Sequence, residues 1–70
     1  MKSYIEVTNG YGIKFSVRKD QVLLVEDTNV KGVVTHEKFT TPSRIYLIAD
    51  PHHPHRVCES RKNIIEQLES

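Results

Sequence analysis

The residues best suited to do chemistry lie in the stretch ADPHHPHRVCES, residues 49–60, which holds three histidines and the only cysteine of the chain. Imidazole and thiolate are ligands that zinc prefers, and His53, His55 and Cys58 could supply three positions of a tetrahedral site. A fourth ligand would have to come from a second chain, from His36 or from Asp50.

The spacing within this stretch favours a solvated turn over a metal site. Pro51 and Pro54 restrict the backbone, the neighbouring side chains of His52 and His53 point apart, and no C-x-x-C or H-x-x-x-H pair is present. A third interpretation is a pH-sensitive contact, because histidine titrates near neutrality. Cys58 is predicted to be a small, partly buried apolar residue of a strand. We therefore expect no metal and no other cofactor.

The sequence does not predict an active site. Cys58 and His36 are a conceivable nucleophile and base, but such a pair also needs an orienting residue and a pocket, for which 70 residues offer little volume. Glu26 and Asp27 are adjacent and so face opposite sides of a strand, which does not suit paired acid and base chemistry. Two of the three glycines fall in a predicted hairpin rather than in a phosphate-binding loop. We therefore predict that the protein is not an enzyme.

Length and composition restrict the class of protein further. Residues 1–70 form one domain, and a chain of this size buries only about 60% of the surface exposed on unfolding, so its stability margin is thin without a partner. One cysteine cannot form an internal disulfide and suits a reducing compartment. The start, MKSYIEVT, lacks the apolar core of a signal peptide, and no run approaches the roughly 20 apolar residues of a membrane helix. A net charge of +1, with both signs interspersed, provides no general attraction to nucleic acids or membranes. We expect a cytoplasmic protein without membrane contacts.

Alternation of apolar and polar residues predicts a hairpin near the N-terminus. In YIEVT, residues 4–8, Ile5 and Val7 share one face, as in a half-buried strand. Asn9-Gly10 is a strong hairpin signal, because both residue types accept positive backbone φ angles. The run IKFSV should therefore return antiparallel. Its inward-facing side chains should be Ile13, Phe15 and Val17.

Further strands are predicted downstream. The run VLLVE, residues 22–26, is apolar on both faces, as expected for a strand in the middle of the sheet or one with a second layer over it. Residues 33–39 are interpreted as a strand extension or an exposed hairpin arm, and residues 44–48 as a clearer strand. The Asp-Pro pair at 50–51 should open a turn, followed by a short strand in HRVCE. Pro54 lacks an N–H group and should keep its segment out of a central strand.

The hydrophobic period changes at the C-terminal end. Ser60 is a good N-cap, and Ile64, Ile65 and Leu68 lie on one face of a helix predicted over about residues 60–69. A helix this short is unstable alone, so it must pack its apolar face against the sheet. The predicted fold class is mainly β (α+β): a small antiparallel sheet or partly open barrel of four to five strands with one C-terminal α-helix.

The order of the segments NG, VLLVED, RIYLIA and VCESRKNIIEQL carries a family resemblance. The last segment has the form V-x-E-S followed by an amphipathic run, and with these features the chain resembles the FlbD-like family of small bacterial motility-associated proteins. The matching positions are Val57, Glu59, Ser60, Ile64 and Leu68, and more loosely Asn9, Gly10, Phe15 and residues 22–26. The chain differs in a longer insert, residues 29–43, and in DPHHPH, where the family has a tight glycine turn. The resemblance implies a non-enzymatic accessory protein of a bacterium or phage that acts through protein contacts.

Two kinds of partner fit these features. The first hypothesis is a protein-interaction or self-assembling module, a homo-oligomer in which sheet edges and aromatic side chains meet another chain. The residues expected at this contact are Tyr4, Tyr11, Phe39 and Tyr46. The alternative is a small nucleic-acid-binding barrel with an aromatic and basic face for single strands. That face would comprise Tyr11, Lys14, Arg18, Lys19, Lys31, Lys38 and Arg44. A second alternative, a metal-binding His/Cys loop protein, follows from the histidine stretch.

Overall fold

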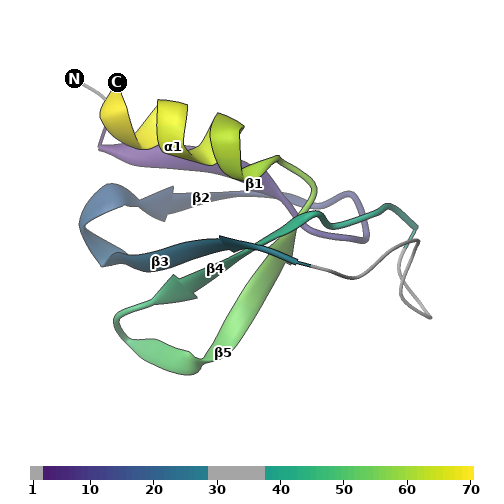
Figure 1. The fold of residues 1–70 in the computed structure, drawn as a ribbon, viewed down its shortest axis with the longest axis horizontal. Helices are drawn as coiled ribbons and strands as arrows, with labels where there is room; N and C mark the ends of the chain where they lie inside the picture. The colour runs from purple at the N-terminus through teal and green to yellow at the C-terminus, as the bar shows by residue number, and fades with distance from the viewer. Residues whose placement is uncertain (1–2, 29–37) are drawn as a thin grey trace.

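Over the residues that it describes, the computed structural model contains two small antiparallel β-sheets, one α-helix and one short 3-10 helix (Figure 1). The structure describes residues 3–28 and 38–70. In chain order the elements are β1 (Tyr4–Thr8), β2 (Lys14–Arg18), the 3-10 helix η1 (Lys19–Gln21), β3 (Val22–Asp27), β4 (Ser43–Leu47), β5 (Asp50–Val57) and α1 (Arg61–Glu69). Strands β1 and β2 form one sheet, and the other has the order β3-β4-β5. The predicted fold class, mainly β with one C-terminal helix, is confirmed.

The N-terminal hairpin has the predicted pairing. Ile5 lies opposite Val17, and Val7 lies opposite Phe15. Ile5, Val7 and Val17 are buried in the core, and Phe15 packs against it. The alternating pattern therefore placed these four side chains on the correct face.

The side chain of Asn9 holds the hairpin loop between β1 and β2. The Asn9 side-chain oxygen accepts hydrogen bonds from the N–H groups of Tyr11 (2.9 Å) and Ile13 (3.1 Å). The positive φ angle belongs to Gly12 (87°) rather than to Gly10. The prediction that Ile13 faces inward is wrong, because this loop holds Ile13 and β2 starts only at the next residue. The side chain of Ile13 is 61% exposed.

Strand β4 is the centre of the three-stranded sheet, with Ser43 and Ile45 fully buried. The prediction that residues 22–26 lie in the middle of the sheet is wrong, since β3 is an edge strand without a buried residue. A register shift between Val22 and Leu24 leaves one extra residue in the strand. This bulge places Val22 and the next valine on the core side and turns both leucines outward.

Strand β5 contains the histidine stretch. The prediction of a turn at residues 50–51 is wrong, because the turn lies at residues 48–49 and Asp50 already pairs with Leu47. The register shifts between that pair and the pair of Ile45 with His55, so β5 has several extra residues there. Both prolines of the stretch lie within this irregular part, and β5 is an edge strand, as expected for a strand containing Pro54.

Helix α1 and the core confirm the C-terminal prediction. The Ser60 hydroxyl accepts the N–H of Asn63 at 3.1 Å and caps the helix. Ile64 is fully buried, Leu68 packs against the core, and α1 packs against β1 and β3. The buried apolar residues are Ile5, Val7, Val17, Ile45, Val57 and Ile64. Within residues 3–28 and 38–70, no helix is long and apolar enough to cross a membrane.

Side chains from the C-terminal segment cover the edge of β1 that faces away from β2. The Glu6 N–H donates to the side-chain oxygen of Gln67 (2.8 Å), whose amide nitrogen donates back to the Glu6 carbonyl (3.0 Å). The Thr8 N–H donates to a Glu59 carboxylate oxygen (2.7 Å), and the Cys58 N–H donates to the Thr8 carbonyl (2.7 Å). The outward backbone groups of Glu6 and Thr8 therefore have hydrogen-bond partners without another strand. The bond from Cys58 to Thr8 also joins the two sheets.

The strand expected over residues 33–39 lies largely outside the described residues. Its last two residues are described, and they form a bend rather than a strand. The N–H groups of Lys38 and Phe39 donate to the Gly10 carbonyl at 2.8 and 3.0 Å. This segment is thereby held against the hairpin loop.

Candidate interaction surface

The histidine stretch does not gather its potential ligands into one group. His52, His53 and His55 are all exposed, and His53 Nδ1 lies 2.8 Å from an oxygen of Asp50. The Cys58 thiol donates to the backbone carbonyl of Asn9 at 3.2 Å. The fourth candidate, His36, lies outside the described residues. Among the described residues, no three His, Cys, Asp or Glu side chains are placed to hold a metal ion.

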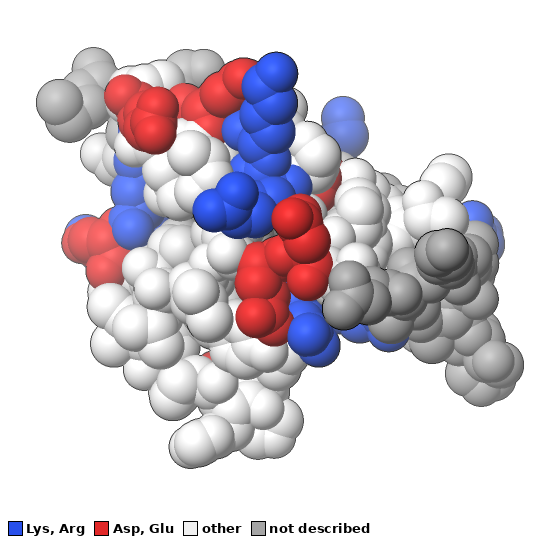
Figure 2. All heavy atoms as spheres, viewed as in Figure 1, with Lys and Arg blue, Asp and Glu red and all other residues white. Residues whose placement is uncertain are grey.

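The basic residues of the nucleic-acid hypothesis are dispersed. Arg18 pairs with Asp20 at 2.9 Å, and the Lys19 ammonium donates to the Ser70 carbonyl at 2.6 Å. The exposed side chains of Lys14 and Lys38 come from β2 and from the segment before β4, and Lys31 lies outside the described residues. Figure 2 shows both signs of charge intermixed on the face that it draws. The described part of the chain therefore brings no continuous basic face together on this side of the molecule.

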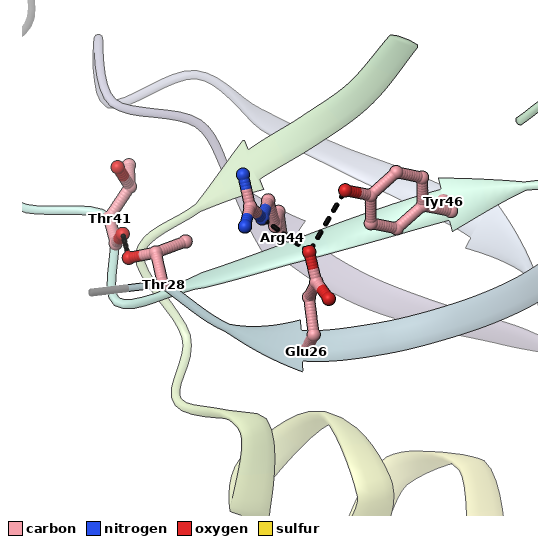
Figure 3. A network of polar contacts seen from close by, with 5 residues as sticks. All are labelled: Glu26, Thr28, Thr41, Arg44 and Tyr46. Atoms are coloured by element: carbon pink, nitrogen blue, oxygen red, sulfur yellow. Dashed lines mark hydrogen bonds and ion pairs between the residues drawn. The ribbon is translucent and has the colours of Figure 1, made fainter. Parts of the chain in front are cut away.

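A polar network on the sheet formed by β3 and β4 engages Arg44 and Tyr46 (Figure 3). Glu26 Oε1 accepts the Tyr46 hydroxyl at 2.9 Å and lies 2.6 Å from Arg44 Nε. The second contact is an ion pair, although the Nε–H is not directed at an acceptor. The hydrogen bond to the Glu26 carboxylate raises the pKa of Tyr46, because it stabilises the protonated phenol. The Arg44 charge is thus compensated within the chain, and the Tyr46 hydroxyl has a partner.

The same network relieves a repulsion between neighbouring strands. Arg44 lies directly opposite Arg56 on β5, and like charges in such cross-strand pairs are destabilising. Glu26 offsets one of the two charges. The Arg56 side chain donates instead to the neutral hydroxyl of Thr41 at 3.1 Å, so its charge has no acidic partner among the described residues.

The four aromatic residues of the protein-contact hypothesis do not form one cluster. Tyr4 (52%), Tyr11 (49%) and Phe39 (51%) are exposed, whereas Tyr46 is half-buried. Phe39 packs closely over the hairpin loop, where a Cβ atom on Gly12 would lie 2.9 Å from its ring. Phe39 and Tyr11 therefore belong to the same end of the molecule. Tyr4 starts β1 at the opposite end of the hairpin.

Three exposed apolar side chains that the sequence did not indicate lie near one another. They form what we call the apolar patch: Leu23 (56% exposed), Leu24 (49%) and Ile48 (54%). The Ile48 N–H donates to the carbonyl of Gln21 at 2.9 Å, which places the turn after β4 beside the start of β3. In Figure 2 the lower left of the molecule, where β3 begins and this turn lies, is mostly uncharged. The adjacent leucines were the only signal, and the bulge that turns both outward has no signature in the sequence.

Comparisons with known proteins identify no relative of this chain. No model of a known protein family matches it. No curated protein and no solved structure is significantly similar to it. The resemblance to the FlbD-like family therefore stays a prediction.

Proposed function

We propose that this protein is a small, non-enzymatic protein-interaction module that assembles with a second copy of itself through the apolar patch. The observation that carries this proposal is the outward orientation of two successive leucines on an edge strand. Each leaves about half of its side chain in water, and covering it would stabilise a complex by about 1 kcal/mol. A domain of this size has little core of its own, so such a gain matters.

The edge position of β3 supports a second copy as the partner. Strand β3 contains no proline, whereas the first part of β5, at the other edge of the sheet, contains Pro51 and Pro54, which limit strand pairing there. An antiparallel pair of β3 strands around a twofold axis would put the acidic end, Glu26 and Asp27, opposite the apolar start of the other copy. Like charges would then stay apart across the contact.

The mixed surface charge supports a protein partner over a nucleic acid. The basic side chains of Arg18 and Arg44 have acidic partners, and the face in Figure 2 carries both signs. Single-strand binding would call for several basic side chains gathered along one groove, and the basic residues of that hypothesis are dispersed over the described part of the chain. The nucleic-acid alternative therefore receives less support than protein contact.

The cellular setting is part of the same proposal. An accessory role in the cytoplasm of a bacterium or phage-infected bacterium is supported by the single cysteine, Cys58, and by the FlbD-like pattern of the C-terminal segment. Catalysis is not part of this proposed role; Glu26, Glu59 and the Asp50–His53 pair make local contacts.

Sedimentation or light scattering across about 1–100 µM tests the proposal. We expect a dimer that Leu24→Asp converts to a monomer without loss of the circular-dichroism spectrum. Ile13→Asp is the matched control, because Ile13 is at least as exposed but lies in the hairpin loop, and this variant should stay dimeric. A wild-type monomer at all concentrations, or equal effects of the two substitutions, would refute assembly through the apolar patch.

A further inference from the structure

A groove lies between the hairpin and β5, away from the apolar patch. It has a volume of about 530 Å³ and opens to the surface. The residues that line it are Asn9, Tyr11, Ile13, Phe15, Pro54, His55 and Arg56. Volumes between about 300 and 1,000 Å³ are typical of ligand sites. The groove is therefore large enough for a few side chains of a bound segment.

The two sheets meet at one end of this groove and separate along it. The Cys58 N–H donates to the Thr8 carbonyl and joins them just after β5. Farther along, the contact between β2 and β5 is made by the rings of Phe15 and His55, whose centroids are 6.0 Å apart. Helix α1 packs against β1 and β3, and none of its residues lines the groove.

One residue of β5, Arg56, has backbone groups beside the groove that no strand pairs. The Thr28 N–H donates to the Pro42 carbonyl, so in the alternating antiparallel pattern Arg44 bonds to β3 and its two neighbours in β4 bond to β5. The pair of Arg44 and Arg56 is therefore not hydrogen-bonded, and the N–H and C=O of Arg56 point away from β4. They point to the same side as the Cys58 N–H, which is the side of the hairpin. The backbone of Arg56 thus offers a donor and an acceptor to an added strand.

The side chains that line the groove are mostly apolar or aromatic, with Arg56 as its one cationic residue besides His55. Tyr11 and Ile13 are 49% and 61% exposed, so the wall on the hairpin side is apolar and accessible. No acidic residue lines the groove, and Arg56 has no acidic partner among the described residues. Its guanidinium is half-buried: Nε donates to Thr41, and Nη2 is buried without a hydrogen-bond partner. An apolar surface beside an uncompensated cation complements an apolar side chain next to a carboxylate.

We propose that this groove binds an extended, acidic segment of a partner protein, which adds as a strand along the Arg56 edge of β5. Its backbone pairs with the outward N–H and C=O of Arg56, one apolar side chain packs against Ile13 and Phe15, and a carboxylate lies near the Arg56 guanidinium. Pro54 lacks an N–H and so limits the added strand to a short one. This site is separate from the apolar patch, and neither proposal depends on the other.

Selection from a phage-displayed library of random dodecapeptides on the full chain tests this proposal. We expect enrichment of peptides in which Asp or Glu alternates with apolar residues. In fluorescence anisotropy, Ile13→Asp should lower the affinity for the best synthetic peptide at least tenfold. Arg56→Gln should lower this affinity and also reduce its dependence on salt concentration. Leu24→Asp, which lies in the apolar patch, should bind the peptide as the wild type does. Peptide binding should also slow hydrogen exchange of the Arg56 amide.

Three results would overturn the proposal. The first is a selection without acidic enrichment, and the second is equal peptide affinity for the wild type and Ile13→Asp. The third is tighter binding of a (dT)12 oligonucleotide than of the best acidic peptide at the same salt concentration, which would assign the groove to single strands. The two variants also separate the two proposals. Leu24→Asp should abolish dimerisation and leave peptide binding intact, whereas Ile13→Asp should weaken peptide binding and leave the dimer intact.

Discussion

Replacement of Gln67 by methionine measures how much the covered edge of β1 contributes to stability. The Gln67 amide exchanges two hydrogen bonds with the backbone of Glu6, at 2.8 and 3.0 Å, and donates a third to the side chain of Asn63 at 2.9 Å. Methionine has a similar length and helix propensity but cannot make these bonds. Each bond contributes about 0.5–1.5 kcal/mol, and water replaces part of this at an accessible site, so we expect a loss of about 1–2 kcal/mol.

Urea unfolding followed by circular dichroism measures this loss directly. For a domain of this size the corresponding fall in Tm is about 4–16 °C. Glu66→Met is the matched control, because Glu66 is the exposed neighbour on the same helix, and its effect should stay within about 0.5 kcal/mol. The Glu6 amide should also exchange faster in Gln67→Met. Equal losses of stability in the two variants, or unchanged protection of the Glu6 amide, would show that the Gln67 side chain does not stabilise the edge of β1 through its hydrogen bonds to Glu6.

Three further outcomes are expected. Ser60→Ala should lower the free energy of unfolding by about 1 kcal/mol, because the Asn63 N–H loses its cap, and an effect below about 0.3 kcal/mol in urea unfolding would contradict the capping role. The pKa of Tyr46 is raised in the folded state, so its contribution is present at neutral pH and is lost as the pH rises through that pKa. The wild type should therefore lose stability more steeply above about pH 10 than Tyr46→Phe, and parallel pH profiles would argue against it. Zinc chloride should leave Tm unchanged, because the three histidines of β5 are exposed and do not converge, whereas a rise of several degrees that EDTA reverses would establish a metal site.

The features predicted correctly from the sequence are those determined by neighbouring residues. Ile5 and Val7 face the core because successive side chains of a strand point to opposite faces of the sheet. Ser60 caps the start of α1, and Ile64 is buried because its position fits the helical period of the apolar face. Tyr11 is exposed, and its assignment to a partner contact stays a prediction. Each of these results depends on fewer than ten consecutive residues.

The order of the strands, and with it the candidate surfaces, was decided by the tertiary structure. The run from residue 22 to 26 has the composition of a central strand, yet it lies at an edge because β4, which begins only at Ser43, pairs with both β3 and β5. The bulge at Leu23 and the early start of β5 at Asp50 follow from the registers of those pairs. Whether a residue is buried or exposed depends on which distant segment packs on it. The native packing is the one that minimises the free energy of the whole chain rather than that of any one stretch.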